Sequence, residues 1–225
     1  MIPISLAHSA EIQVLASTGM YSLLHEMIPS YETKSGNKLI VSYDTSNIIL
    51  NRVKSGESSD LIILTGAAID DLIKQGKVAQ IGRTNIAQSG IGVAIKTGSV
   101  VPNISTPEAL KATLLQAKSI SFTATGASGI YFVSLLDRMG IGAEMKPKLR
   151  PMPGEYNVEV VATGSVDMVV VVASRIYGVP GVDMLGLIPK ELQTWIGFAT
   201  GINPQSQHAE AARALTKFLS TPPAD

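Results

Sequence analysis

Two pairs of hydroxyl residues, Ser17-Thr18 and Thr45-Ser46, stand where an apolar strand pattern stops and a helical pattern begins. A hydroxyl at such a junction can accept a hydrogen bond from the free amides of the first helical turn. The same amides, with the helix dipole behind them, can instead bind an anion. Because the carboxyl ends of neighbouring parallel strands meet at one edge of a sheet, the two junctions are expected to converge. The repeated strand-hydroxyl-helix unit therefore predicts an α/β fold that holds a small anion.

Strand and helix patterns alternate along the chain, which is typical of α/β proteins with mostly parallel strands. The near-continuous apolar run at residues 167–173 predicts a strand covered on both faces. A helix near residue 130 is expected to turn Ile130, Val133, Leu136 and Met139 to one inward side. The other predicted strands cover residues 11–16, 38–43, 60–64, 87–95, 119–122, 182–188 and 195–202, and the other predicted helices cover residues 20–31, 47–53, 68–75 and 208–219, with one more that begins after Thr106.

The pattern changes from simple strand-helix units to a glycine-punctuated strand and later returns, which predicts two lobes joined by two hinge crossings. Lobe I is expected to comprise residues 11–86 and 190–225, and lobe II residues 87–189. Mixed, mostly parallel sheets with flanking helices would form this two-lobed fold, and a ligand would bind in the cleft between the lobes. Residues 1–10 are apolar and end in small residues, so they are interpreted as the remnant of an export signal, with an ordinary N-terminal segment as the alternative.

The composition excludes several classes of partner. The chain has 18 basic and 18 acidic residues, so no global electric field favours nucleic acid or an anionic membrane. We expect no nucleic-acid partner and no membrane insertion, because aromatic residues make up only 5% of the chain and no apolar run is long enough for a span. Cysteine is absent, and the three histidines, His8, His25 and His208, lie far apart, so neither a metal site nor a cofactor is predicted.

Four segments place small hydroxyl residues or glycines after a strand or at a helix start. Glycine lets backbone amides approach a ligand, and hydroxyls add donors that can turn toward it. For each single junction the alternative is a structural N-cap, which stabilises its helix by about 1 kcal/mol. The same chemistry at four junctions favours an anion site formed by Ser17, Thr18, Gly19, Thr45, Ser46, Thr65, Gly66, Gly126, Ser128 and Gly129.

Arg175 is the charged residue best placed to join this site, because it follows directly after the apolar strand at residues 167–173. A guanidinium at that position can bind a carboxylate through two hydrogen bonds. The alternative is a surface arginine in a loop. Glu155, Tyr156 and Asn157 are predicted to open a helix and could also face the cleft.

The chain carries, in order, the segments Val-Leu-Ala-Ser-Thr-Gly, Ser-Tyr-Asp-Thr-Ser and Asp-Leu-Ile-Ile-Leu, followed by Ser89-Gly-Ile-Gly-Val-Ala94, Ser105-Thr-Pro-Glu-Ala-Leu110, Gly126-Ala-Ser-Gly-Ile-Tyr-Phe132 and Gly164-Ser-Val-Asp167. Together these segments resemble the molybdate-type periplasmic solute-binding proteins, which have the type 2 periplasmic-binding fold. The resemblance covers nearly the whole chain after Ala10.

This resemblance implies a two-lobed periplasmic protein that closes on an oxyanion and serves an ABC importer. In that family hydroxyls and backbone amides at helix starts hold the anion, and the matching positions here are Ser17, Thr45, Ser46 and Ser128. The segment Ala-Ser-Arg-Ile after the long strand lacks the tyrosine that helps to hold molybdate in the family. The stretch at residues 126–132 resembles a divergent branch similar to the periplasmic aconitate isomerases, which bind a tricarboxylate.

Two functions of different classes stay open. One is a binding protein that captures a small oxyanion or carboxylate without catalysis. The other is an aconitate isomerase, which moves a proton along an unsaturated tricarboxylate and needs an acid or base beside the carbon skeleton. The candidates for that role are a cleft hydroxyl, Tyr131 or Glu155. A third interpretation is a cytosolic anion-sensing domain, because no complete export signal is visible.

Overall fold

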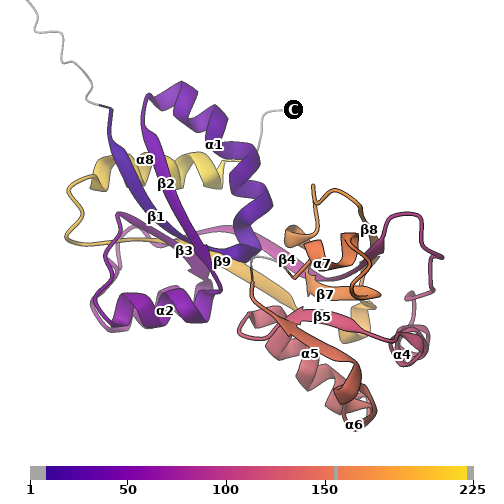
Figure 1. Ribbon diagram of the computed structural model, residues 1–225. Helices are drawn as coiled ribbons and strands as arrows, with labels where there is room; N and C mark the ends of the chain where they lie inside the picture. Colours follow the sequence, from indigo (N-terminus) through magenta and orange to yellow (C-terminus); the bar gives the residue numbers. More distant parts are fainter. Residues whose placement is uncertain (1–8, 155–156, 222–225) are drawn as a thin grey trace, which may run out of the picture.

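The computed structural model describes residues 9–154 and 157–221, and element labels follow Figure 1. Within these residues the strands form one connected mixed sheet in the order β2-β1-β3-β9-β4-β7-β5-β6, with β8 paired to β4. Helices flank the sheet, so the predicted α/β class is confirmed.

The first half of the sheet consists of β2, β1, β3 and β9, and it carries the helices α1, α2, α3 and α8 (Figure 1). Strand β1 runs parallel to β2 and to β3, whereas β9 runs antiparallel to β3. The bounds are β1 Glu11–Ser17, α1 Tyr21–Ser35, β2 Lys38–Asp44, α2 Ser46–Lys54, β3 Leu61–Thr65, α3 Gly66–Lys74, β9 Trp195–Ile202 and α8 Ala209–Ser220.

The second half consists of β7, β5, β6 and β8 with the helices α4, α5, α6 and α7. Strand β5 runs parallel to both β6 and β7. The bounds are α4 Pro107–Gln116, β5 Ile120–Thr123, α5 Ala127–Arg138, α6 Gly142–Met145, β6 Leu149–Met152, α7 Glu159–Ala162, β7 Met168–Val172 and β8 Val182–Leu187.

Strand β4, Thr84–Lys96, joins the two halves. Its first part pairs antiparallel with β9, and its second part pairs antiparallel with β7 and β8. Just before β9, the side chain of Gln193 continues the pairing: Oε1 accepts from the Ile91 amide at 2.7 Å, and Nε2 donates to the Ile91 carbonyl at 3.0 Å. The backbone of β4 therefore keeps hydrogen-bond partners where it passes between the halves. The predicted lobe boundaries stay a prediction.

Strand β7 shows why its sequence is apolar at every position. All five of its residues are buried. Alternate side chains face opposite sides of the sheet, and both sides are covered here. Val169 and Val171 belong to the core that includes α1 and α8, whereas Met168 and Val170 belong to the core beneath α4 and α5. The prediction of a strand covered on both faces is confirmed.

Three local predictions differ from the structure. The inward face of α5 carries Phe132, Leu135 and Leu136, while Ile130 and Val133 are exposed, so the predicted face was wrong for those two. The short edge strand β6 was not predicted, because its sequence Leu-Arg-Pro-Met lacks a strand pattern and proline is tolerated only at an edge. The helix expected to open at residues 155–157 begins at Glu159 as α7, and Glu155 and Tyr156 lie outside the described residues.

Candidate functional site

A small cavity lies where the two halves of the sheet meet, at the ends of β1, β3, β5 and β7. Its volume is about 30 Å³, which is room for about two ordered waters. A ligand larger than a few atoms therefore does not fit this cavity as it stands. The lining consists of Ser17, Thr18, Gly19, Thr45, Ser46, Thr65, Thr123, Gly126, Ala127, Ser128, Val171, Val172, Arg175, Ile196 and Phe198.

The hydroxyl junctions are more than helix caps. Ser17 does cap in part, because its Oγ accepts from the Gly19 amide at 3.4 Å. Thr45 and Thr65 occupy the N-cap positions of α2 and α3, yet neither side chain makes a capping hydrogen bond. Gly126 occupies the N-cap of α5 and has no side chain that could cap it. The N-cap alternative therefore fails at three of the four junctions, whose first-turn amides are left for other partners.

The two halves touch around this cavity. Thr45 of the first half and Thr125 of the second share a hydrogen bond between their Oγ1 atoms at 3.0 Å. Asn47 Nδ2 donates to the Thr125 carbonyl at 3.0 Å, and Ser174 Oγ donates to the Gly19 carbonyl at 2.6 Å. Because these contacts join residues on or beside the cavity lining, the structure shows the site in a closed arrangement.

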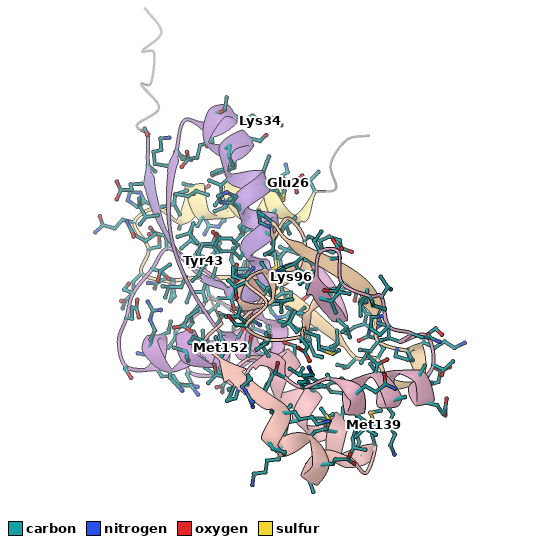
Figure 2. All side chains as sticks on the ribbon, turned by 45° about the vertical axis from the view of Figure 1, so that its right-hand side comes forward. Glu26, Lys34, Tyr43, Lys96, Met139 and Met152 are labelled. Carbon is teal, nitrogen blue, oxygen red and sulfur yellow. The ribbon has the colours of Figure 1, made fainter. Side chains whose placement is uncertain are left out.

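The segment after β6 packs against two residues of the cavity lining. Figure 2 labels Met152, the last residue of β6, close to the first half of the molecule. Two residues later, Gly154 packs so tightly that a Cβ atom there would lie 2.9 Å from Thr18 Oγ1 and 3.1 Å from Thr45 Cγ2. Backbone of the second half therefore rests directly on two hydroxyl residues of the first.

Arg175 is only 3% exposed and lines the cavity, so the alternative of a surface arginine is wrong. Its Nη2 donates to Glu159 Oε1 at 2.6 Å, and its guanidinium lies 5.2 Å from the centre of the Tyr21 ring. Tyr21 also packs edge to face against Tyr43, labelled in Figure 2. Burial, and secondly the neighbouring Tyr21, raises the pKa of Tyr43 to about 12, so this phenol is neutral at physiological pH. Arg175 thus sits in the cavity wall in contact with both halves.

The structure brings most of the predicted site residues together. Nine of the eleven line the cavity, whereas Gly66 and Gly129 do not. Gly66 borders a neighbouring groove beside Arg83, and Gly129 lies behind the site, packed against the backbone of β5. Tyr131, a candidate acid or base, lies elsewhere, and its hydroxyl donates to the Leu192 carbonyl at 2.6 Å. The roles of the nine residues in ligand binding stay a prediction.

Sequence reasoning missed part of the lining. Thr123 could have been found, because it is a hydroxyl directly after the predicted strand at residues 119–122, in the pattern used elsewhere. Ala127, inside the predicted 126–129 segment, was passed over because its side chain carries no polar group. The apolar residues Val171, Val172, Ile196 and Phe198 gave no local indication, since a strand residue at a cavity looks like any core residue in sequence.

Among the described residues, no carboxylate or imidazole lines the cavity, and no group of three or more His, Cys, Asp or Glu could hold a metal ion. The polar groups of the wall are hydroxyls, backbone amides and one guanidinium. Such a donor set favours negative charge. The described part of the chain also contains no helix with the length and apolarity needed to cross a bilayer.

Comparisons with known proteins agree with this geometry. Residues 12–225 match the family model for bacterial extracellular solute-binding proteins. An aconitate isomerase from a Pseudomonas species is 35% identical over 216 residues, covering 93% of this chain and 82% of the relative.

Two solved structures share the fold at low sequence identity. The periplasmic molybdate-binding protein of Azotobacter vinelandii has a TM-score of 0.79 at 13% identity, over 94% of this chain and 93% of that one. The sulfate-binding protein SubI of Mycobacterium tuberculosis has a TM-score of 0.68 at 20% identity, over 95% and 82% of the two chains. These matches confirm the fold predicted from the sequence.

Proposed function

Because the chain belongs to the bacterial extracellular solute-binding proteins, we propose that it captures a small carboxylate or oxyanion in the cavity between the halves of its sheet. One observation carries the proposal: seven residues with hydroxyl side chains and the buried Arg175 line the cavity, and no described acidic residue joins them. Donors from both halves would hold the anion, so binding stabilises the closed arrangement. The two predicted lobes would be the parts that move apart and close on the ligand.

The wall of the cavity favours a carboxylate over an inorganic oxyanion. Val171, Val172, Ile196 and Phe198 give part of the lining an apolar character that suits carbon atoms. Arg175 supplies the planar pair of donors that fits a carboxylate. The small volume of the cavity would then belong to the ligand-free closed form, which must open to admit an organic acid. As a family member, the protein would act in the periplasm and deliver its ligand to an ABC importer.

A thermal-shift series tests this function. We expect one or more of molybdate, tungstate, sulfate, phosphate, citrate, cis-aconitate and trans-aconitate to raise the melting temperature, because a ligand that binds only the native state stabilises it. At a concentration 100 times the Kd the gain is about 2.7 kcal/mol. That corresponds to a rise of roughly 5–10 °C for a chain of this size. Sodium chloride at matched ionic strength is the control, and a series in which no anion exceeds it would contradict the proposal.

A second candidate is an isomerase that interconverts cis- and trans-aconitate. The 35% identity to an aconitate isomerase over 93% of the chain favours it. The chemistry requires a group that takes a proton from one carbon and returns it to another. Within the described residues the cavity offers hydroxyls for this task but no carboxylate or imidazole.

The isomerase activity is directly measurable. If the protein is an isomerase, the ultraviolet spectrum of trans-aconitate should drift toward the equilibrium mixture after protein is added, and heat-denatured protein should leave it unchanged. If the spectrum stays constant while the thermal shift shows that trans-aconitate binds, the protein is a binding protein without this activity.

A further inference from the structure

Asn157 is a buried amide held by β5 directly behind the cavity wall. Its side chain is 0% exposed, and its Nδ2 donates to Thr123 Oγ1 at 2.6 Å. Its backbone carbonyl accepts from Ser121 Oγ at 2.8 Å. Ser121 and Thr123 are two residues apart on one strand, so their side chains point to the same face and grip Asn157 at two points. The position of the amide relative to Thr123 is therefore fixed by the fold.

This contact fixes the direction of the Thr123 hydroxyl. An amide nitrogen can only donate, so the Thr123 oxygen accepts, and the single hydroxyl hydrogen must point elsewhere. Among the described residues, the Thr123 side chain makes no other hydrogen bond. Turning the amide around would let the hydroxyl donate to Oδ1, but it would bury both N–H groups of Asn157 without partners. Because Thr123 lines the cavity, its hydrogen is left for whatever the cavity holds.

The amide oxygen of Asn157 shows that an asparagine at this position is not there to stabilise the fold. Its Oδ1 is buried and has no hydrogen-bond partner. A buried acceptor without a partner destabilises the native state, and such atoms are rare in folded proteins. An apolar side chain would avoid this cost. The hydrogen bond from the amide nitrogen therefore explains why an asparagine occupies this position: it orients the Thr123 hydroxyl.

The first half of the sheet repeats this arrangement. Ser46 Oγ accepts from the Thr65 amide at 3.0 Å, so its hydroxyl hydrogen is likewise left for another partner. Both Ser46 and Thr123 line the cavity, and they come from opposite halves. A ligand that accepts from both would bridge the halves.

We propose that Thr123 donates a hydrogen bond to the bound anion and that Asn157 is the positioning residue that holds this hydroxyl as a donor. The inference rests on the proposed function, because it names how the second half of the sheet grips the ligand. It concerns a side chain behind the wall rather than the helix starts from which the site was predicted.

The test compares the affinity for trans-aconitate and for molybdate with the melting temperature of the ligand-free protein. We expect Thr123→Val to weaken binding of the anion that binds the wild type at least tenfold, and Thr123→Ser to restore most of it. Asn157→Ala should weaken binding several-fold in the wild-type background and have no further effect in the Thr123→Val background, because the two residues act as one unit.

Thr113→Val is the matched control. Thr113 is a buried threonine on α4 whose Oγ1 donates to the Asn103 carbonyl at 2.7 Å, away from the cavity lining. The substitution Thr113→Val should lower the melting temperature and leave the affinity for the anion unchanged. If Thr123→Val behaves like Thr113→Val, or if Asn157→Ala weakens binding equally in both backgrounds, the inference is overturned. If the wild type binds neither anion nor any other in the thermal-shift series, the proposed function itself has failed.

Discussion

Gly129→Ala is expected to lower the free energy of unfolding by about 3 kcal/mol, because overpacking against backbone cannot relax by a side-chain rotation. A Cβ atom at Gly129 would lie 1.9 Å from the Thr123 carbonyl oxygen and 2.7 Å from the carbonyl carbon. To relieve this clash, α5 must move away from β5. The movement would loosen Phe132, Leu135 and Leu136, which α5 contributes to the core. In a thermal melt followed by circular dichroism, we expect the midpoint to fall by roughly 10 °C.

Gly197→Ala is the matched control for this change. Gly197 lies in β9, its φ angle is not positive, and a Cβ atom there would meet no atom within 4 Å. We expect its free energy of unfolding to stay within about 0.5 kcal/mol of the wild type. Equal effects of the two alanines would show that the close approach of α5 to β5 does not hold the helix in place. Because Ala127 and Ser128 line the cavity from the first turn of α5, the Gly129 variant should also lose ligand affinity.

The strand-hydroxyl-helix junctions were predictable because all their determinants are local. An apolar run, a hydroxyl and a helical pattern lie within a few residues at Ser17 and Thr45, and parallel pairing of β1 with β2 brings these two together. The fold and the resemblance to molybdate-type binding proteins are confirmed for the same reason, since a series of such local patterns in a fixed order specifies the topology.

The face of α5 could not be predicted correctly, because apolar residues occur on more than one side of that helix. Ile130 is 52% exposed although it lies beside the buried Gly129. What decides the rotation of the helix is the close approach of Gly129 to β5, which is a tertiary contact. The contribution of Asn157 was equally hidden, because its partner Thr123 lies 34 residues away in the chain.

Arg175→Met is expected to weaken the binding of trans-aconitate at least tenfold. Arg175 is a lining residue of the cavity and is 3% exposed, so a carboxylate that reaches its guanidinium would form a charge-assisted hydrogen bond away from water. Such a bond contributes about 1.5–3 kcal/mol, and 1.4 kcal/mol corresponds to a factor of ten in affinity. Methionine keeps most of the length of the side chain without its charge. Isothermal titration of each variant gives the affinity, and a thermal melt of the ligand-free protein gives the stability.

Glu159→Gln separates a role in binding from a role in holding the structure together. Arg175 Nη2 and Glu159 Oε1 lie 2.6 Å apart, with the two side chains 4% and 42% exposed. Losing the carboxylate charge removes one charge-assisted contact of a buried guanidinium, so the melting temperature of the ligand-free protein should fall. Glu159 does not line the cavity, so the affinity for trans-aconitate should stay close to that of the wild type. Arg175→Met is thus expected to lower the affinity for trans-aconitate, whereas Glu159→Gln is expected to lower the melting temperature and leave the affinity unchanged.

The affinity of Arg175→Met for molybdate distinguishes the two kinds of ligand, an inorganic oxyanion and a carboxylate. An oxyanion held by hydroxyls and amides should lose little affinity in Arg175→Met, whereas a tricarboxylate needs the planar donors of the guanidinium. A selective loss of trans-aconitate binding would assign Arg175 to a carboxylate of the ligand. A variant that melts earlier but binds both anions as the wild type does would instead restrict Arg175 to its contacts with Glu159 in its own half and with Tyr21 in the first half. In that case the carboxylate preference would have to come from the apolar wall alone, and Phe198 would be the residue to change next.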